Sequence, residues 1–148
     1  MDNLNDLSKI GVSVSISLFC YDGGEKKILT VVNKKQPFKN ALTLPNKIMK
    51  SNQSLEDVCS EILKENIGND KIYIEQLNAF GKVYRHPEGR IIDISFYGLI
   101  NLEKDSVKLN VENNAKFINI ESNTALAFDH KEMIDRGLKR IKRRTKKR

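Results

Sequence analysis

Three acidic residues recur at every fourth position in the middle of the chain, at Asp57, Glu61 and Glu65. On a helix this spacing places them in one stripe along one face. Carboxylate oxygens are the ligands that Mg²⁺ prefers, so two carboxylates on neighbouring turns could share one ion. The stripe also suits a solvated helix face, with Lys64 and Lys71 nearby to offset its charge. Both interpretations require a helix here.

The surrounding residues predict that helix. Apolar side chains fall at the i, i+3, i+4, i+7 and i+8 positions of one buried face, namely Leu55, Val58, Cys59, Ile62 and Leu63. Ser54 precedes the run and Asp57 lies three residues later, a spacing typical of an N-terminal cap. Gly68 suits a left-handed C-terminal stop. We therefore predict a helix over Leu55–Ile67, preceded by a loop.

In residues 44–69 these features follow the order of a known motif. Counted from Lys47, the segment resembles the box of the Nudix (MutT-like) family, G-x5-E-x7-R-E-U-x-E-E-x-G-U, where U is apolar. The positions that match are Leu44, Pro45, Leu63, Glu65 and Gly68. Leu44 and Pro45 form the Leu-Pro dipeptide that usually precedes the box.

The box is degenerate, because most of its defining positions differ. The replacements are Asn46 and Lys47 for glycines, Gln53, Ile62 and Asn66 for glutamates, Glu61 for the arginine and Asn69 for the last apolar residue. One of the four family glutamates survives. The resemblance implies Mg²⁺ as a cofactor, and the losses predict that this site is weak or absent. If the chain is active, Glu65 and Glu61 are its candidate catalytic and metal-binding residues.

Segments outside the box extend the resemblance to residues 12–141. Residues 34–43, KKQPFKNALT, resemble the stretch before the box in relatives that hydrolyse or sense ADP-ribose. Residues 80–90 resemble the same subgroup's loop, and residues 116–120 and 126–134 resemble its closing strand and last helix. The resemblance implies a nucleotide-type ligand such as ADP-ribose, and it admits a homodimer. It also implies the specific fold, a mixed β-sheet sandwiched between helices.

Four residues are candidate ligand contacts. Arg85 and Arg90 flank a loop, and their planar forks suit phosphate oxygens; the alternative is two solvent-facing charges, paired with Glu88 or unpaired. Lys47 stands at a glycine slot and could pair with a phosphate, partly replacing the charge of a metal. Phe38 could stack on a base or ribose, or fill the core. Tyr84 has the same ambiguity as Phe38.

Composition supports one soluble domain. The chain has 148 residues and no apolar stretch approaching the ~20 residues that span a bilayer. Its polar, acidic start differs from a secretion signal, and its two cysteines suit reduced core thiols, so we expect a cytoplasmic protein without membrane contact. We predict one Nudix-like domain over residues 1–135 and a basic helix end or tail over residues 136–148.

That tail carries the positive charge of the chain. From Arg136 to Arg148 there are nine basic residues and no acidic one, while the rest holds 17 basic and 19 acidic residues, a net charge of −2. A basic run is usually a solvated terminus, and it can also attract the phosphate backbone of a nucleic acid. No aromatic residue interleaves the run, so base stacking has no support there.

The remaining patterns predict a mixed α/β (α+β) fold. Alternation of valine, isoleucine or leucine with serine over residues 12–18 predicts a half-buried strand, and residues 27–33 would complete a hairpin around Gly23 and Gly24. Further strands are predicted over residues 71–81, 90–102 and 116–120, and an amphipathic helix over residues 131–142.

Three functional hypotheses follow. The first is a catalytically impaired Nudix-like domain that binds a nucleoside diphosphate derivative such as ADP-ribose in a sensing or regulatory role. The second is an active pyrophosphohydrolase of nucleoside diphosphates linked to another group, with an atypical Mg²⁺ site at Glu61 and Glu65 and with Asp57 as a further candidate ligand. The third is a scaffold that contacts nucleic acid through its basic tail. We favour the first, because the family's sequence pattern persists around a depleted metal helix.

Overall fold

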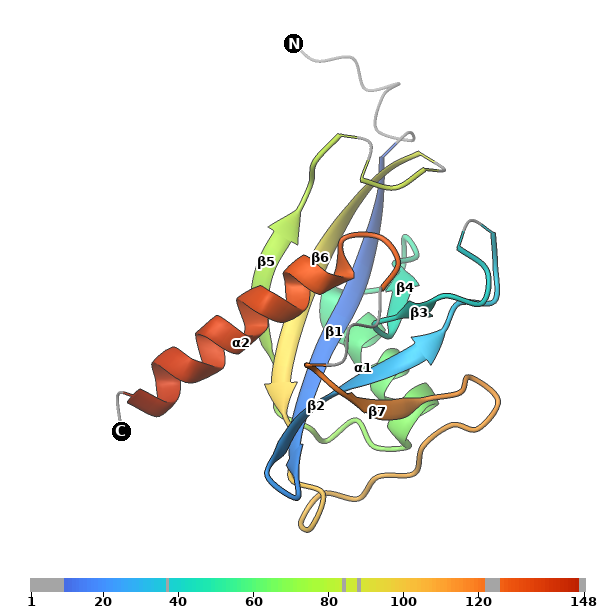
Figure 1. Ribbon diagram of the computed structural model, residues 1–148. Helices are drawn as coiled ribbons and strands as arrows, with labels where there is room; N and C mark the ends of the chain where they lie inside the picture. The colour runs from blue at the N-terminus through green and yellow to red at the C-terminus, as the bar shows by residue number, and fades with distance from the viewer. Residues whose placement is uncertain (1–9, 37, 84, 88, 122–125, 147–148) are drawn as a thin grey trace.

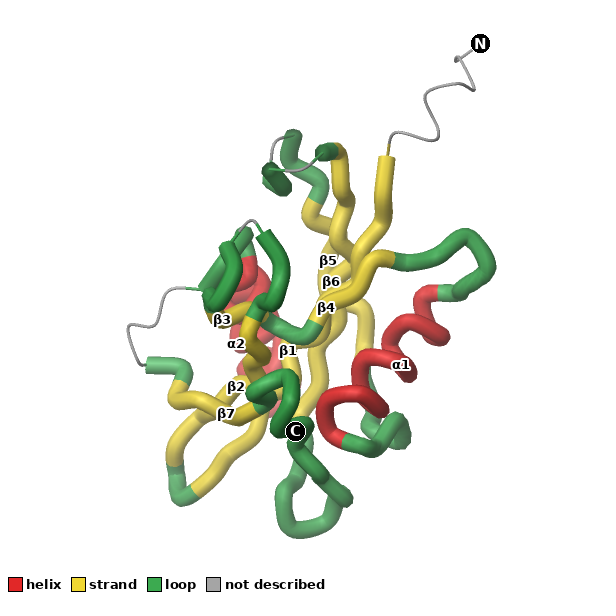
Figure 2. The backbone as a smooth tube through the Cα atoms, turned by 90° about the vertical axis from the view of Figure 1, so that its right-hand side faces the viewer, coloured by secondary structure: helices red, strands yellow, loops and turns green. Residues whose placement is uncertain are grey.

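The computed structural model describes residues 10–36, 38–83, 85–87, 89–121 and 126–146. Within them the elements are β1 (Ile10–Asp22), β2 (Glu25–Val32), β3 (Leu42–Thr43), β4 (Asn46–Ile48), α1 (Leu55–Ile67), β5 (Glu75–Phe80), β6 (Arg90–Leu99), β7 (Lys116–Asn119) and α2 (His130–Lys146). Figure 1 shows α2 crossing one face of the sheet, and Figure 2 shows α1 on the opposite face. The predicted mixed sheet between helices is confirmed.

The long strand β1 is the centre of the sheet, whose order is β3-β2-β1-β6-β5, with β4 paired to β1 and β7 to β2. β1 runs parallel to β6 and antiparallel to β2. The predicted hairpin is confirmed: Asp22 pairs with Glu25 across Gly23 and Gly24, whose φ angles of 60° and 83° suit a two-residue turn.

The prediction of a loop before α1 is wrong, because this segment contains the short strands β3 and β4. β4 pairs with β1 in the register Val14↔Lys47, and β3 pairs with β2. Between these two strands, Leu44 is completely buried. Each strand has at most three residues, too few for an alternation pattern to be visible in the sequence.

The prediction that β1 is half-buried is wrong, because both faces of this strand are covered. Val14, Ile16 and Leu18 join the core under α1. On the other face Ser15 and Ser17 are completely buried. The Ser15 hydroxyl lies 3.2 Å from the Met133 sulfur of α2. Serine is small enough for α2 to approach β1 closely, so the polar positions mark a second buried face.

Helix α1 begins and ends where its sequence predicts. The Asp57 amide donates to the Ser54 hydroxyl and the Ser54 amide donates to the Asp57 carboxylate, a complete capping box. Gly68 closes the helix with φ of 68°. Val58 and Ile62 of its inner face are at most 2% exposed.

Other element boundaries differ by a few residues. β5 begins at Glu75, four residues after the predicted start, and β6 ends at Leu99, because Asn101 turns the chain by accepting a hydrogen bond from the Asp105 amide. The predicted domain boundary at 135/136 falls inside α2, and Ile141 of this helix is 7% exposed within the core. Leu138 and Ile141 therefore pack against the core, and the division into a domain and a basic helix end stays a prediction.

Both cysteines are free and buried, as predicted. Over the described part of the chain, no helix combines the length and the apolar character needed to cross a membrane.

Candidate functional site

Lys47 links β4 to the acidic stripe of α1. Its ammonium lies 2.6 Å from a carboxylate oxygen of Glu61 and also hydrogen-bonds Glu65. The second carboxylate oxygen of Glu61 accepts from the side-chain amide of Gln53 at 2.7 Å. Asp57, the third member of the stripe, is engaged in the helix cap. The two candidate carboxylates thus share one cation that belongs to the protein itself.

Electrostatics favour the charged forms of Lys47 and Glu61. Partial burial lowers the pKa of Lys47, but the hydrogen bonds and charges of Glu61 and Glu65 outweigh it and hold that pKa above its ordinary value. The hydrogen bond from Lys47, followed by that from Gln53, lowers the pKa of Glu61. A carboxylate stabilised in this way is a poor proton acceptor.

A divalent metal does not fit the group as it stands. Among the described residues, no cluster of three or more His, Cys, Asp or Glu side chains could hold a metal ion. Mg²⁺ needs near-octahedral oxygen ligands, and the position that Glu61 and Glu65 both reach is taken by the Lys47 ammonium. The Lys47 side chain therefore determines the charge of the site as well as its shape.

A cavity of about 330 Å³ is lined in part by Lys47. It is lined by Val31, Val32, Asn33, Lys34, Lys35, Thr43, Pro45, Asn46, Lys47, Ile48, Glu65, Asn66 and Asn113. Its lining carries three lysines and one carboxylate, so the net charge is positive. Most of its remaining polar groups are neutral amides. Such a lining suits a phosphate-bearing ligand.

Asn66 fixes the wall of this cavity. It is 5% exposed, and its side-chain amide donates to the Ile62 carbonyl at 2.9 Å and accepts from Asn113 at 3.2 Å. Asn113 in turn accepts from the Lys34 ammonium at 3.0 Å. A glutamate at position 66 could not donate to that carbonyl when ionised. Asn66 thus links α1, through Asn113, to Lys34 in the loop that follows β2.

The structure contradicts the solvent-facing interpretation of Arg85, whereas its role as a phosphate contact stays a prediction. Its side chain is 5% exposed and makes a two-point ion pair with Asp129, at 2.9 and 2.6 Å. It is therefore not solvent-facing, and its fork is directed at a protein carboxylate. Arg90, the other predicted clamp residue, donates to the Lys82 carbonyl at 3.0 Å. Glu88 and Tyr84 lie outside the described residues.

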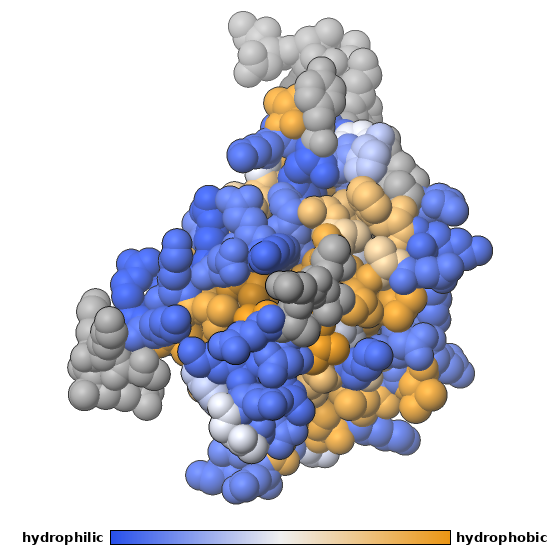
Figure 3. Space-filling view, in the orientation of Figure 1, coloured by the Kyte–Doolittle hydropathy of each residue, from blue (hydrophilic) through white to orange (hydrophobic). Residues whose placement is uncertain are grey.

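Phe38 belongs to an aromatic cluster rather than to the core. The ring is 44% exposed and meets Phe128 edge-on at 5.0 Å, while His86 stacks on Phe128 at 4.9 Å. Phe38 and Phe128 have φ angles of 64° and 59°, which are uncommon for bulky residues. In Figure 3 hydrophobic surface gathers on the upper right, beside the loop that leads into α2.

Two sets of buried polar groups on the α2 side of the sheet were missed by sequence reasoning. The Asp93 carboxylate is 1% exposed and accepts from the hydroxyls of Ser13 and Ser15 at 2.6 and 2.5 Å. Desolvation raises its pKa to about 6. His130 accepts from the Leu44 amide at 3.0 Å, and burial lowers its pKa to about 4. The sequence offered one signal for this buried carboxylate, because Asp93 is the single acidic residue in the mainly apolar segment 91–96.

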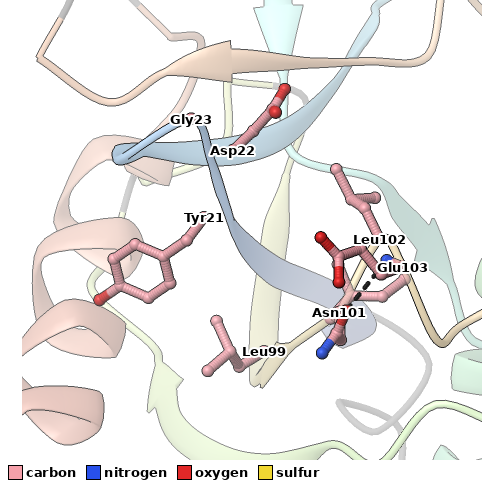
Figure 4. Close-up of a pocket in the computed structure, with 8 residues that line it drawn as sticks. Tyr21, Asp22, Gly23, Leu99, Asn101, Leu102 and Glu103 are labelled. Carbon is pink, nitrogen blue, oxygen red and sulfur yellow. Dashed lines mark hydrogen bonds between the residues drawn. The ribbon is translucent and has the colours of Figure 1, made fainter.

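A second cavity, of about 430 Å³, lies at the β1–β2 turn. Figure 4 shows the Glu103 carboxylate beside Leu102, while the Tyr21 ring and the Asp22 carboxylate point away from them. Among the described residues that line it, none is basic. The cavity at Lys47 is therefore the better candidate for an anionic ligand.

Comparisons with known proteins show what the chain resembles. No protein-family model matches the chain. The ADPR responsive transcriptional repressor NtrR of Acinetobacter baylyi is 24% identical over 139 residues, and the ADP-ribose pyrophosphatase of Methanocaldococcus jannaschii is 26% identical over 111 residues. These alignments cover 91% and 74% of this chain, which spans only 56% and 64% of the two relatives.

Solved structures show the fold. The Nudix domain of Shewanella oneidensis NrtR, complexed with ADP-ribose, matches with a TM-score of 0.77 and 23% identity over 95% of this chain and 94% of that one. NrtR of the same organism, complexed with a 27mer DNA, matches with a TM-score of 0.80 and 24% identity over 89% and 62%. The chain has the Nudix fold, which confirms the predicted fold.

Proposed function

We propose that this Nudix-fold chain binds a nucleoside diphosphate derivative such as ADP-ribose in a sensing or regulatory role, without hydrolysing it. The observation that carries the proposal is the Lys47 ammonium between Glu61 and Glu65, beside a cavity lined by further lysines. The two curated relatives with ADP-ribose in their names support the choice of ligand.

Binding without a metal follows from the charges around the cavity. Lys34 and Lys35 bring two positive charges to its wall, and Lys47 offsets the carboxylates of Glu61 and Glu65. Ammonium groups form charge-assisted hydrogen bonds with phosphate oxygens. In active metal-dependent hydrolases, the ion both neutralises the diphosphate and activates a water molecule. Lysines can perform the first task, but they do not generate the nucleophile. The site therefore favours retention of the ligand over its cleavage.

The test is calorimetric titration of the protein with ADP-ribose in the presence of EDTA, together with product analysis after incubation with Mg²⁺. We expect saturable binding in EDTA and no AMP. Lys35→Ala should weaken binding by roughly tenfold, the loss of one charge-assisted hydrogen bond. Lys39→Ala is the matched control, an exposed lysine of the same loop that does not line the cavity. Equal effects of the two substitutions would contradict the proposed site.

The hydrolase is the second candidate, and the likeness to the M. jannaschii pyrophosphatase favours it. It would require Glu61 and Glu65 to release Lys47 and take up Mg²⁺. Mg²⁺-dependent formation of AMP and ribose 5-phosphate that is lost in Glu65→Gln would establish this candidate in place of the first.

Nucleic-acid binding through the basic end of α2 is the third candidate. The 27mer DNA complex of the Shewanella protein motivates it. Arg136 and Arg140 stack their guanidinium groups over Phe80 and Tyr97, at 5.2 and 5.8 Å from the ring centroids, so these two charges are held at the sheet surface. Salt-sensitive binding of duplex DNA that weakens in Lys139→Glu would support it; salt-independent or absent binding would reject it.

A further inference from the structure

The position of Lys47 is fixed by the backbone rather than by a flexible loop. In β4 it pairs with Val14 of the central strand, and its side chain is half-buried against α1. Glu61 and Glu65 lie one turn apart on that helix, so both reach the same point in space. The side-chain nitrogen of Gln53 donates to the second oxygen of Glu61. The side-chain oxygen of Gln53 accepts from the backbone amide of Lys50 at 3.0 Å, which fixes the Gln53 side chain.

We infer that Lys47 is a tethered cation that occupies a latent divalent-cation site formed by Glu61 and Glu65. Both carboxylates hydrogen-bond one Nζ atom, so an ion in its place would meet the same two oxygens. A tethered cation here gives a physical reason why the chain lacks most of the metal ligands that the resemblance implies. The protein supplies one covalently attached positive charge where a free ion would otherwise bind.

Charge balance determines which cation the site accepts. The two carboxylates carry −2, and Lys47 reduces the group to −1. A divalent ion would have to approach an ammonium that is already hydrogen-bonded to both ligands. Without the ammonium the charge of −2 matches a divalent ion, and water can complete its coordination. Because the inferred site involves only protein groups and a metal, it can be tested without any nucleotide.

The direct test is Mn²⁺ binding, followed by the electron paramagnetic resonance signal of free Mn²⁺. Lys47→Met keeps the apolar stem and removes the charge. We expect its Mn²⁺ affinity to exceed that of the wild type by at least about tenfold, since a unit charge about 4 Å from a divalent ion acts strongly even in water. Lys47→Met combined with Glu65→Gln should lose the gain.

Two controls separate the charge from other effects of substitution. Lys64→Met removes an equal charge from α1, the helix that carries both carboxylates, and should leave Mn²⁺ binding unchanged, because Lys64 pairs instead with Asp70 at 3.4 Å. Lys47→Arg keeps the charge and should also show no gain, and it serves as a second variant if Lys47→Met is poorly folded. Tight Mn²⁺ binding by the wild type, a gain in Lys47→Arg or no gain in folded Lys47→Met would overturn the inference.

A second arm rests on the proposed function. ADP-ribose binding by Lys47→Met should fall roughly tenfold in EDTA and recover when Mn²⁺ is added, because the ion restores the missing charge. The two ideas fail separately. If Mn²⁺ binding appears in Lys47→Met but neither protein binds ADP-ribose, the latent cation site stands and the proposed ligand is wrong. If ADP-ribose binds but Mn²⁺ does not, the latent site is wrong.

Discussion

Replacing Asp93 by asparagine should change how stability depends on pH, because this carboxyl group is buried and has a raised pKa. Its ordinary value is 3.8 and its folded value is about 6. Between these values the folded protein binds the proton and the unfolded chain does not, so the Asp93 contribution grows as pH falls. The stabilising contribution of Asp93 is fully present below pH 3.8 and is lost as pH rises through about 6. Between these two limits the free energy of unfolding changes by about 3 kcal/mol through Asp93.

His130 has the opposite effect over nearly the same range. Burial lowers its pKa from 6.5 to about 4, so the unfolded chain binds the proton while the folded protein does not. Its contribution is present above pH 6.5 and is lost as pH falls through about 4, again by about 3 kcal/mol. The two contributions oppose each other, and the wild type should show little net dependence between pH 4 and 6.

Urea unfolding followed by circular dichroism from pH 4 to 7.5 measures this balance. In Asp93→Asn the His130 contribution is unopposed, so stability should fall by about 3 kcal/mol as pH falls from 7 to 4. In His130→Asn, whose side-chain oxygen can still accept from the Leu44 amide, stability should rise as pH falls. A pH-independent difference between Asp93→Asn and the wild type would refute this reasoning.

Three further substitutions test the packing that holds the site. Arg85→Ala should lower the free energy of unfolding by about 3–5 kcal/mol, because it leaves the Asp129 carboxylate without its partner; a loss below about 1 kcal/mol in urea unfolding would contradict this. Gly98→Ala should cost about 1–3 kcal/mol, since a Cβ there would lie 2.8 Å from the Tyr73 carbonyl oxygen; an unchanged unfolding midpoint would contradict it. Ser54→Ala should cost about 1 kcal/mol through the lost cap of α1, and Ser54→Asp should restore most of it in thermal unfolding.

Local patterns predicted the elements that local interactions determine. The apolar spacing and caps of α1 lie within one continuous segment, and both of its ends were predicted correctly. The serines of β1 were misassigned because their burial depends on α2, which lies more than a hundred residues later in the chain. Alternation in a sequence indicates two faces, but it does not reveal what covers the second.

The candidate site was predictable only in part. Glu61, Glu65 and Lys47 were singled out individually, but nothing in their spacing shows that one lysine bridges both carboxylates. That contact depends on the pairing of β4 with β1, a tertiary feature. The ion pair of Arg85 with Asp129 joins residues 44 positions apart and was missed for the same reason.

The most direct test of the central claim is the binding of ADP-ribose to the full chain with every divalent cation removed by EDTA. If lysines replace the metal, binding should be saturable, should weaken as salt screens the charges, and should change little when Mg²⁺ is restored. Mg²⁺ should also release no AMP. Binding that appears only with Mg²⁺ and is accompanied by steady hydrolysis of ADP-ribose would contradict the account.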